Sequence, residues 1–139
     1  MTMFDIEQSI AFSLVKGHQR VTADFRAEFK ESGLSPPQFF LLAFLWEKDG
    51  LSQVELSRKS RIDRTTIGRI IDQLEKAGLL IRQSFPRDRR AYRIMLTEKG
   101  RSLEEESCQA ACRVQDKIVG RITPEGYDRL QGLLFKLIN

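Results

Sequence analysis

The sequence predicts a mainly α-helical fold that contains one small β-hairpin. Apolar residues recur at helical spacing through most of the chain, which is typical of amphipathic helices packed around a core. Two short segments with helix-capping signals, 53–59 and 64–76, are separated by a tight turn. Two short strands, 79–84 and 90–96, follow them and are joined by a turn at 85–89.

The first third of the chain predicts two helices of different character. Over residues 5–30, apolar side chains recur at spacings of four and seven, as in one long amphipathic helix. These side chains are Ile6, Ile10, Leu14, Val21, Phe25 and Phe29. Ser35-Pro36 is typical of a helix start, and residues 39–46 are apolar on almost every side. We therefore expect the second helix in the middle of the core, with its end at Asp49-Gly50.

Residues 52–78 have the pattern of a helix-turn-helix. Ser52 and Glu55 form a capping box, which predicts a short helix over 53–59 followed by a turn at 60–62. Asp63 can cap the next helix, whose apolar residues fall at positions i, i+3, i+4 and i+7. These residues are Ile67, Ile70, Ile71 and Leu74. The helix ends at Ala77-Gly78, and two short helices joined in this way form a helix-turn-helix.

The second half of the chain adds a basic hairpin and two further helices. The hairpin over 79–96 corresponds to the wing of a winged helix-turn-helix. Thr97 can cap a long helix that runs to about Gly120, and Thr123-Pro124-Glu125 starts a final helix. We therefore predict one domain, with a winged helix-turn-helix lobe over 35–100 and a helical region formed by 1–34 and 101–139.

The distribution of charge predicts a surface that binds a polyanion. The window 61–101 carries eleven lysines and arginines against five acids, a net charge of +6, whereas the rest of the chain carries −2. Concentrated positive charge of this kind is typical of nucleic-acid-binding proteins. Charge alone leaves an ordinary solvated basic face as the alternative.

Composition argues against several other classes of protein. No apolar run approaches the ~20 residues that cross a bilayer, and the first residues lack the basic segment and cleavage site of a secretory signal, so we expect a cytoplasmic protein. The single histidine and the two cysteines lack the usual spacing of a zinc site, and we expect neither metal nor cofactor. No nucleophile is paired with a base, so we do not expect an enzyme.

The helix that follows Asp63 carries the candidate DNA-reading side chains. With ~100° of rotation per residue, Thr65 and Arg69 point away from the apolar stripe, Thr66 and Gln73 flank that outward face, and Arg64 lies in the first turn. In a helix-turn-helix the N-terminal part of the second helix meets base edges in the major groove. Arg69 can bond a guanine through two atoms, while the threonines can contact a thymine methyl or a phosphate.

The tip of the hairpin carries a second set of candidate DNA contacts. Arg87, Arg89 and Arg90 surround Asp88 there. An aspartate among arginines weakens a purely electrostatic patch, so we expect Asp88 to orient Arg90 toward the adjacent minor groove. Arg87 and Arg89 are then expected to contact phosphates. A winged-helix module that binds proteins instead of DNA is the alternative, but it has no need for five basic residues between Arg82 and Arg93.

Four segments in order make the chain similar to the MarR family of bacterial regulators. They are Ile62-Asp63-Arg64-Thr65-Thr66-Ile67, Leu74-Glu75-Lys76-Ala77-Gly78-Leu79, Pro86-Arg87-Asp88-Arg89-Arg90-Ala91 and Leu96-Thr97-Glu98-Lys99-Gly100. The resemblance implies a homodimeric transcriptional regulator, most often a repressor, on a pseudo-palindromic double-stranded operator. It implies that the first and last helices dimerise and that Asp88 and Arg90 are the minor-groove pair. One departure is Ser60-Arg61, where many relatives carry Leu-Gly.

The resemblance also implies release from DNA by a small molecule or an oxidant. The place of the pocket in such proteins suggests His18, Phe39 and Trp46 as residues that bind an aromatic or phenolic effector. A histidine at the position of His18 is more often a partly buried structural residue. Cys108 and Cys112 can be small apolar residues of a subunit interface or redox sensors. Nearby acids disfavour a reactive thiolate, so we expect the first of these roles.

Overall fold

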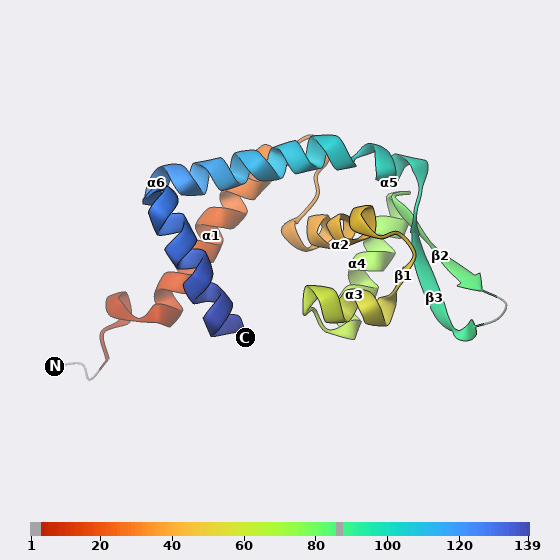
Figure 1. Cartoon of the computed structure of the whole chain (residues 1–139), viewed down its shortest axis with the longest axis horizontal. Helices are drawn as coiled ribbons and strands as arrows, with labels where there is room; N and C mark the ends of the chain where they lie inside the picture. The colour runs from red at the N-terminus through yellow and green to blue at the C-terminus, as the bar shows by residue number, and fades with distance from the viewer. Residues whose placement is uncertain (1–3, 86–87) are drawn as a thin grey trace. The chain divides into compact units, whose positions relative to one another are not determined.

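The computed structural model describes residues 4–85 and 88–139, with the backbone alone described at 85 and 88–91. The chain divides into two compact units, unit 1 (1–33 and 109–139) and unit 2 (34–108). Figure 1 shows the helices and strands in their order along the chain. They are η1 (Ile6–Gln8), α1 (Ile10–Glu28), α2 (Pro36–Glu47), β1 (Leu51–Ser52), α3 (Gln53–Ser60), α4 (Arg64–Lys76), β2 (Leu80–Phe85), β3 (Asp88–Leu96), α5 (Glu98–Ser102) and α6 (Glu104–Ile138). A mostly helical chain with a small antiparallel sheet confirms the predicted fold class.

Unit 2 is a winged helix-turn-helix. Strands β2 and β3 form the predicted hairpin, in which Leu80 pairs with Leu96 and Arg82 with Ile94. A two-residue strand that we did not predict, β1, pairs with the other edge of β3, so the strand order is β1-β3-β2. This short strand leads directly into α3, and it therefore joins the helix-turn-helix to the base of the wing.

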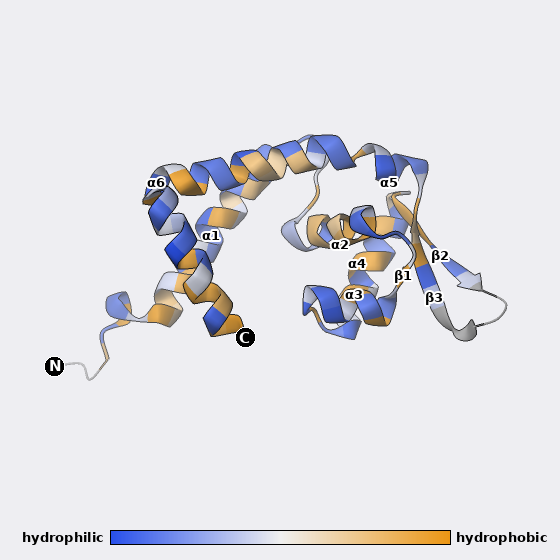
Figure 2. Ribbon diagram, viewed as in Figure 1, coloured by the Kyte–Doolittle hydropathy of each residue, from blue (hydrophilic) through white to orange (hydrophobic). Residues whose placement is uncertain are grey.

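Helix α2 lies in the core of unit 2, as its apolar sequence predicts. Leu41, Leu42 and Leu45 have no exposed surface, and the helix is drawn mostly in orange in Figure 2. Ser35 and Gln38 form a capping box at its start, because each side chain accepts a hydrogen bond from the backbone N–H of the other. Burial of this helix anchors the elements around it, since apolar area removed from water is the main stabilising term.

Arg61 lies in the turn of the helix-turn-helix with a left-handed backbone. Arg61 has φ of 58° and ψ of 27°, which is the left-handed conformation at the C-terminus of α3. Glycine adopts this conformation without strain, whereas an L side chain costs about 1–2 kcal/mol there. Arg61 therefore occupies a backbone conformation that glycine would adopt with less strain.

The predicted long helices are interrupted or kinked in the structure. The predicted helix over 5–30 is interrupted, because Ser9 has an extended backbone and caps α1 after the short η1. The predicted helix from Thr97 to Gly120 is likewise two helices, since α5 ends at Ser102 and α6 begins at Glu104. Helix α6 then kinks at Thr123, where the predicted last helix starts, because the residue before a proline disfavours the helical conformation.

Ion pairs hold α1 against α6 within unit 1. Arg121 makes a two-atom contact with Asp24, with Nη2 and Oδ1 separated by 2.9 Å. Glu28 accepts from Arg113 at 2.7 Å and pairs with Lys117 at 2.8 Å. Asp24 is only 7% exposed, and its pKa is held below the ordinary value, first by the hydrogen bond from Arg121. These contacts fix the register of the two helices.

The described part of the chain has neither a membrane-spanning helix nor a cluster of metal ligands. None of the helices within 4–85 and 88–139 has the length and apolar character needed to cross a membrane. The same part of the chain contains no group of three or more His, Cys, Asp or Glu residues that could hold a metal ion.

Candidate nucleic-acid interface

Helix α4 separates an apolar face from a polar one. Ile67, Ile70, Ile71 and Leu74 are buried in unit 2, at most 5% exposed. Thr65 and Arg69 are exposed on the other side of the helix, and Arg64 is exposed in its first turn. The structure thus places Thr65 and Arg69 on an accessible face opposite the buried stripe, as a 3.6-residue period predicts.

The start of α4 is fixed by its cap. The carboxylate of Asp63 accepts hydrogen bonds from the backbone N–H of Thr66 at 3.0 Å and from its hydroxyl at 2.7 Å. The hydroxyl contact is the largest of several that lower the pKa of Asp63. The side chain of Thr66 is therefore engaged in the cap, whereas Thr65 presents its side chain to solvent.

Gln73 has a second role that the sequence did not indicate. Its Oε1 accepts a 2.9 Å hydrogen bond from Nε2 of Gln38, which lies at the start of α2. The predicted contact with DNA stays a prediction, but the amide already links α4 to the core helix.

Arg82 is the residue of this site whose role sequence reasoning missed. It lies on β2, where the sequence pattern indicates only one more positive charge. Its guanidinium pairs with Asp72 at 2.6 Å and Glu75 at 3.1 Å, and it donates to the carbonyl of Gly68 at 3.3 Å. The available signal was the spacing of 68, 72 and 75, which places these three positions on one face of a helix.

The base of the wing is held against the end of α4 by the two family-like segments 74–79 and 96–100. The hydroxyl of Thr97 donates to the carbonyl of Gly78 at 2.6 Å, and its backbone N–H donates to Leu79 at 3.1 Å. Nζ of Lys99 donates to the carbonyl of Ala77 at 3.0 Å. The hairpin therefore leaves the end of the recognition helix in a defined direction.

The predicted contacts at the wing tip cannot be traced here. Arg87 lies outside the described residues, and the side chains of Asp88, Arg89 and Arg90 lie outside the described part as well. The backbone of residues 88–90 forms the start of β3. Their roles in DNA binding stay predictions.

The predicted effector residues belong to different units. Phe39 and Trp46 lie together on α2 in unit 2, with ring centroids 5.9 Å apart, and Nε1 of Trp46 donates to the carbonyl of Gly100 at 2.9 Å. His18 belongs to unit 1, where it is exposed and lines an open hollow of about 220 Å³ with Arg26 and other residues of α1. Cys108 and Cys112 are exposed on α6.

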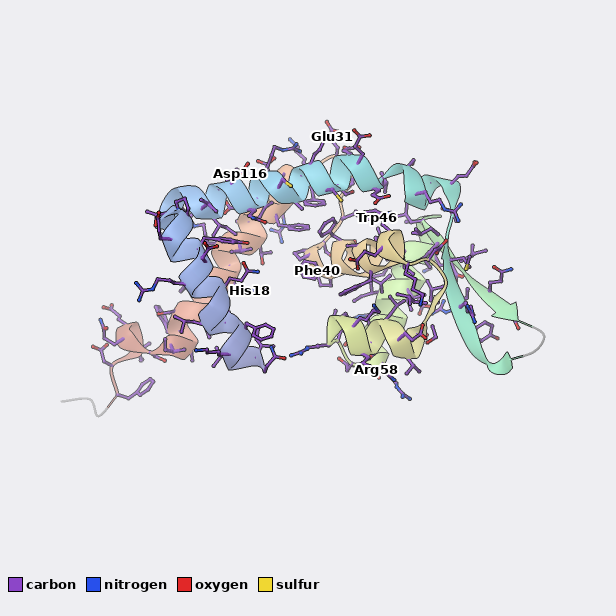
Figure 3. The ribbon with its side chains drawn as sticks, in the orientation of Figure 1. His18, Glu31, Phe40, Trp46, Arg58 and Asp116 are labelled. Carbon is purple, nitrogen blue, oxygen red and sulfur yellow. The ribbon has the colours of Figure 1, made fainter. Side chains whose placement is uncertain are left out.

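A separate apolar pocket opens in unit 2 between α2 and the end of α3. Its volume is about 190 Å³. The lining residues are Phe40, Ala43, Phe44, Lys59 and Ser60. Figure 3 shows Phe40 and Trp46 extending from the same helix, α2. The pocket therefore combines aromatic walls with one primary amine.

Comparison with known proteins agrees with this geometry. The model of the MarR family matches residues 34–92, which contain the helix-turn-helix and most of the wing. A protein of Thauera aromatica that is named as a regulator of the hcr operon is 30% identical over 92% of this chain and 78% of its own length. The chain belongs to the MarR family. It is accordingly a DNA-binding transcriptional regulator and not an enzyme.

Solved structures of MarR-type regulators share the whole fold. The transcriptional repressor CouR bound to a 23-mer DNA duplex is 28% identical, with a TM-score of 0.88 over 100% of this chain and 99% of that one. CouR has also been solved with p-coumaroyl-CoA. BpsR of Bordetella bronchiseptica, whose DNA binding is regulated by 6-hydroxynicotinic acid, is 27% identical with a TM-score of 0.90 over 99% of both chains.

Proposed function

We propose that this MarR-family protein is a repressor that binds a pseudo-palindromic operator as a homodimer. Helix α4 enters the major groove, and the wing enters the adjacent minor groove. The observation that carries this proposal is the exposed face of α4, on which Thr65 and Arg69 lie opposite the buried stripe, with Arg64 exposed in the first turn. The DNA-bound relative CouR supports the proposal, because the two chains share one fold over their full length.

The apolar surface of unit 1 supports the dimer. Phe4, Ile6 and Ile10 are 61–69% exposed near the N-terminus. Leu133, Phe135, Leu137 and Ile138 are 62–67% exposed on the last turns of α6. So many large apolar side chains in one unit are typical of a surface that a partner covers. Two recognition helices in a two-fold dimer then read half-sites about one DNA turn, ~10 bp, apart.

DNA fragments selected from the source genome, followed by footprinting, test the operator. We expect an imperfect palindrome protected by a dimer, with affinity that falls steeply as salt rises. Analytical ultracentrifugation of the full chain tests the dimer, and deletion of 123–139 is expected to shift it toward monomer or aggregate and remove specific binding. A full-length monomer that protects both half-sites would overturn the dimer.

The direction of the change in operator affinity tests the role of the wing. Arg90→Ala is expected to remove most specific binding, because it takes away the minor-groove contact. Asp88→Ala is also expected to weaken binding, although it makes the protein more positive. Tighter operator binding by Asp88→Ala at physiological salt would mean that the wing acts as a simple charge patch.

We further propose that a single-ring aromatic carboxylate releases the DNA by binding the pocket between α2 and α3. The relatives are regulated by, or bind, an aromatic acid or an aromatic acyl-CoA. A volume of about 190 Å³ suits one ring, and Phe40 and Phe44 can contact its faces while Lys59 pairs with the carboxylate. His18, Phe39 and Trp46 remain the alternative effector residues.

Calorimetric titration with 6-hydroxynicotinic acid tests this site. We expect Lys59→Gln to weaken binding of the acid, because the ion pair is lost, while operator affinity without the acid is retained. His18→Gln is the matched control in unit 1 and is expected to leave binding of the acid unchanged. The opposite pattern would assign the effector to the hollow on α1.

A further inference from the structure

We propose that Arg82 is a positioning residue for DNA recognition, which sets the angle between helix α4 and the wing so that both fit one half-site. Arg82 joins the two elements through Gly68, Asp72 and Glu75, and we call these four residues the α4–β2 clamp. The inference rests on the proposed function, in which α4 and the wing contact neighbouring grooves.

The clamp spans two turns of the recognition helix. Its three acceptors on α4 fall at positions i, i+4 and i+7 and so lie along one face. One guanidinium contacts all three, at 3.3 Å from the carbonyl of Gly68, 2.6 Å from Asp72 and 3.1 Å from Glu75. A planar group with several fixed donors can bridge such a row, whereas the single ammonium of lysine cannot hold the same geometry.

Glu75 binds both the backbone and the side chain of Arg82 on the wing. Oε2 of Glu75 accepts a 3.1 Å hydrogen bond from the backbone N–H of Arg82, while Oε1 accepts from the guanidinium. Strand β2 is at the edge of the sheet, where backbone N–H groups lack a neighbouring strand on one side. The carboxylate therefore ties this edge to α4 at a point beyond the base contacts of Thr97.

The length of the hairpin makes this attachment important for DNA binding. At about 3.3 Å per residue, six residues of β2 extend the tip about 20 Å beyond the base. A rotation of ~10° at the base would move the tip by roughly 3 Å, which is more than the ~0.5 Å tolerance of a positioned binding group. A second contact part-way along the strand limits that rotation.

A direct phosphate contact by Arg82 fits the structure less well. Its side chain is 24% exposed, and two carboxylates already surround the guanidinium. The positive charge is thus largely balanced within the protein. A positioning role and a phosphate-binding role of Arg82 predict opposite changes in DNA affinity when an acidic partner is removed. Removing Asp72 should tighten DNA binding if charge alone matters and weaken it if the clamp matters.

The test measures the affinity of full-length variants for two duplexes, the operator and a copy whose minor-groove flank is replaced. We expect Arg82→Gln and Asp72→Asn each to weaken operator binding about tenfold and to reduce discrimination between the two duplexes. The dependence of log Kd on log salt should stay unchanged, because the number of phosphate contacts is the same. Arg82→Lys keeps the charge and is expected to show the same loss of discrimination.

Arg101→Gln is the matched control, since Arg101 forms one ion pair with Asp49 at 3.0 Å in the same unit. It should leave discrimination unchanged, and thermal melting should show each variant folded. Unchanged or tighter operator binding by Asp72→Asn would overturn the clamp. The clamp would also be overturned if Arg82→Gln lost affinity equally for both duplexes and showed a weaker dependence of log Kd on log salt. If Arg69→Ala and Arg90→Ala also bind normally, the proposed function itself fails.

Discussion

The hydroxyl of Thr97 donates a 2.6 Å hydrogen bond to the carbonyl oxygen of Gly78. The same hydroxyl accepts from the backbone N–H of Gly100 at 3.1 Å, so one side chain caps α5 and holds the end of the recognition helix. Two segments that look independent in the sequence therefore form a single joint at the base of the wing.

This joint depends on a glycine at position 100. A methyl group there would lie 2.0 Å from the carbonyl oxygen of Leu79, which already accepts from Thr97. Relieving this clash requires a shift of the backbone. We therefore expect Gly100→Ala to lower the free energy of unfolding by about 3 kcal/mol, the upper part of the range for overpacking. Urea unfolding followed by circular dichroism measures it. Gly120→Ala, which meets open space in α6, is the control and should be neutral or stabilising.

Arg61 and Gly78 both have a left-handed backbone conformation, and opposite substitutions at the two positions test its energetic cost. Arg61→Gly removes a strain of about 1–2 kcal/mol but adds about 0.4–1 kcal/mol of chain entropy to the unfolded state, so we expect a net gain of about 0.5–1 kcal/mol. Gly78→Ala should lose about 1 kcal/mol, because its φ is 75° and no atom blocks the added methyl. Thermal midpoints of the two variants that move in the same direction would contradict this account.

The contact between Asp24 and Arg121 predicts a dependence of stability on pH. The folded pKa of Asp24 is lowered, so its stabilising effect is present above the unfolded pKa of about 3.9 and is lost as pH falls through the folded value. We expect Asp24→Asn to lower the urea midpoint at pH 7, and the difference from the natural chain to shrink as pH falls below the unfolded pKa and through the lower folded pKa. Asp116→Asn, an exposed acid of α6, is the control. A difference that does not change with pH would contradict the linkage.

Arg69 is expected to read a base. Arg69→Ala should cost about 1–3 kcal/mol on the operator and relax specificity at one base pair of each half-site. Arg58→Ala removes the same charge from the exposed face of α3 and should weaken all sequences equally. Fluorescence anisotropy with single-base operator variants measures both. An equal loss on every duplex for Arg69→Ala would reduce its role to a phosphate contact.

The sequence by itself determined the helix-turn-helix and the faces of its second helix. Ser35, Ser52 and Asp63 cap their helices as predicted, because a cap depends on residues only three apart. The buried stripe of α4 followed from the period of the helix. Such features are local, so neighbouring residues carry the whole signal.

Only the tertiary structure decided the partners of Arg82 and the breaks in the long helices. Arg82 meets Gly68 from fourteen residues away because the turn at Gly78 folds the hairpin back on α4, and no local pattern encodes that direction. The break at Ser9 was hidden because Ile6 and Ile10 continue the apolar spacing across it. Apolar spacing reports which residues share a face, whereas the continuity of a helix depends on the backbone at single residues.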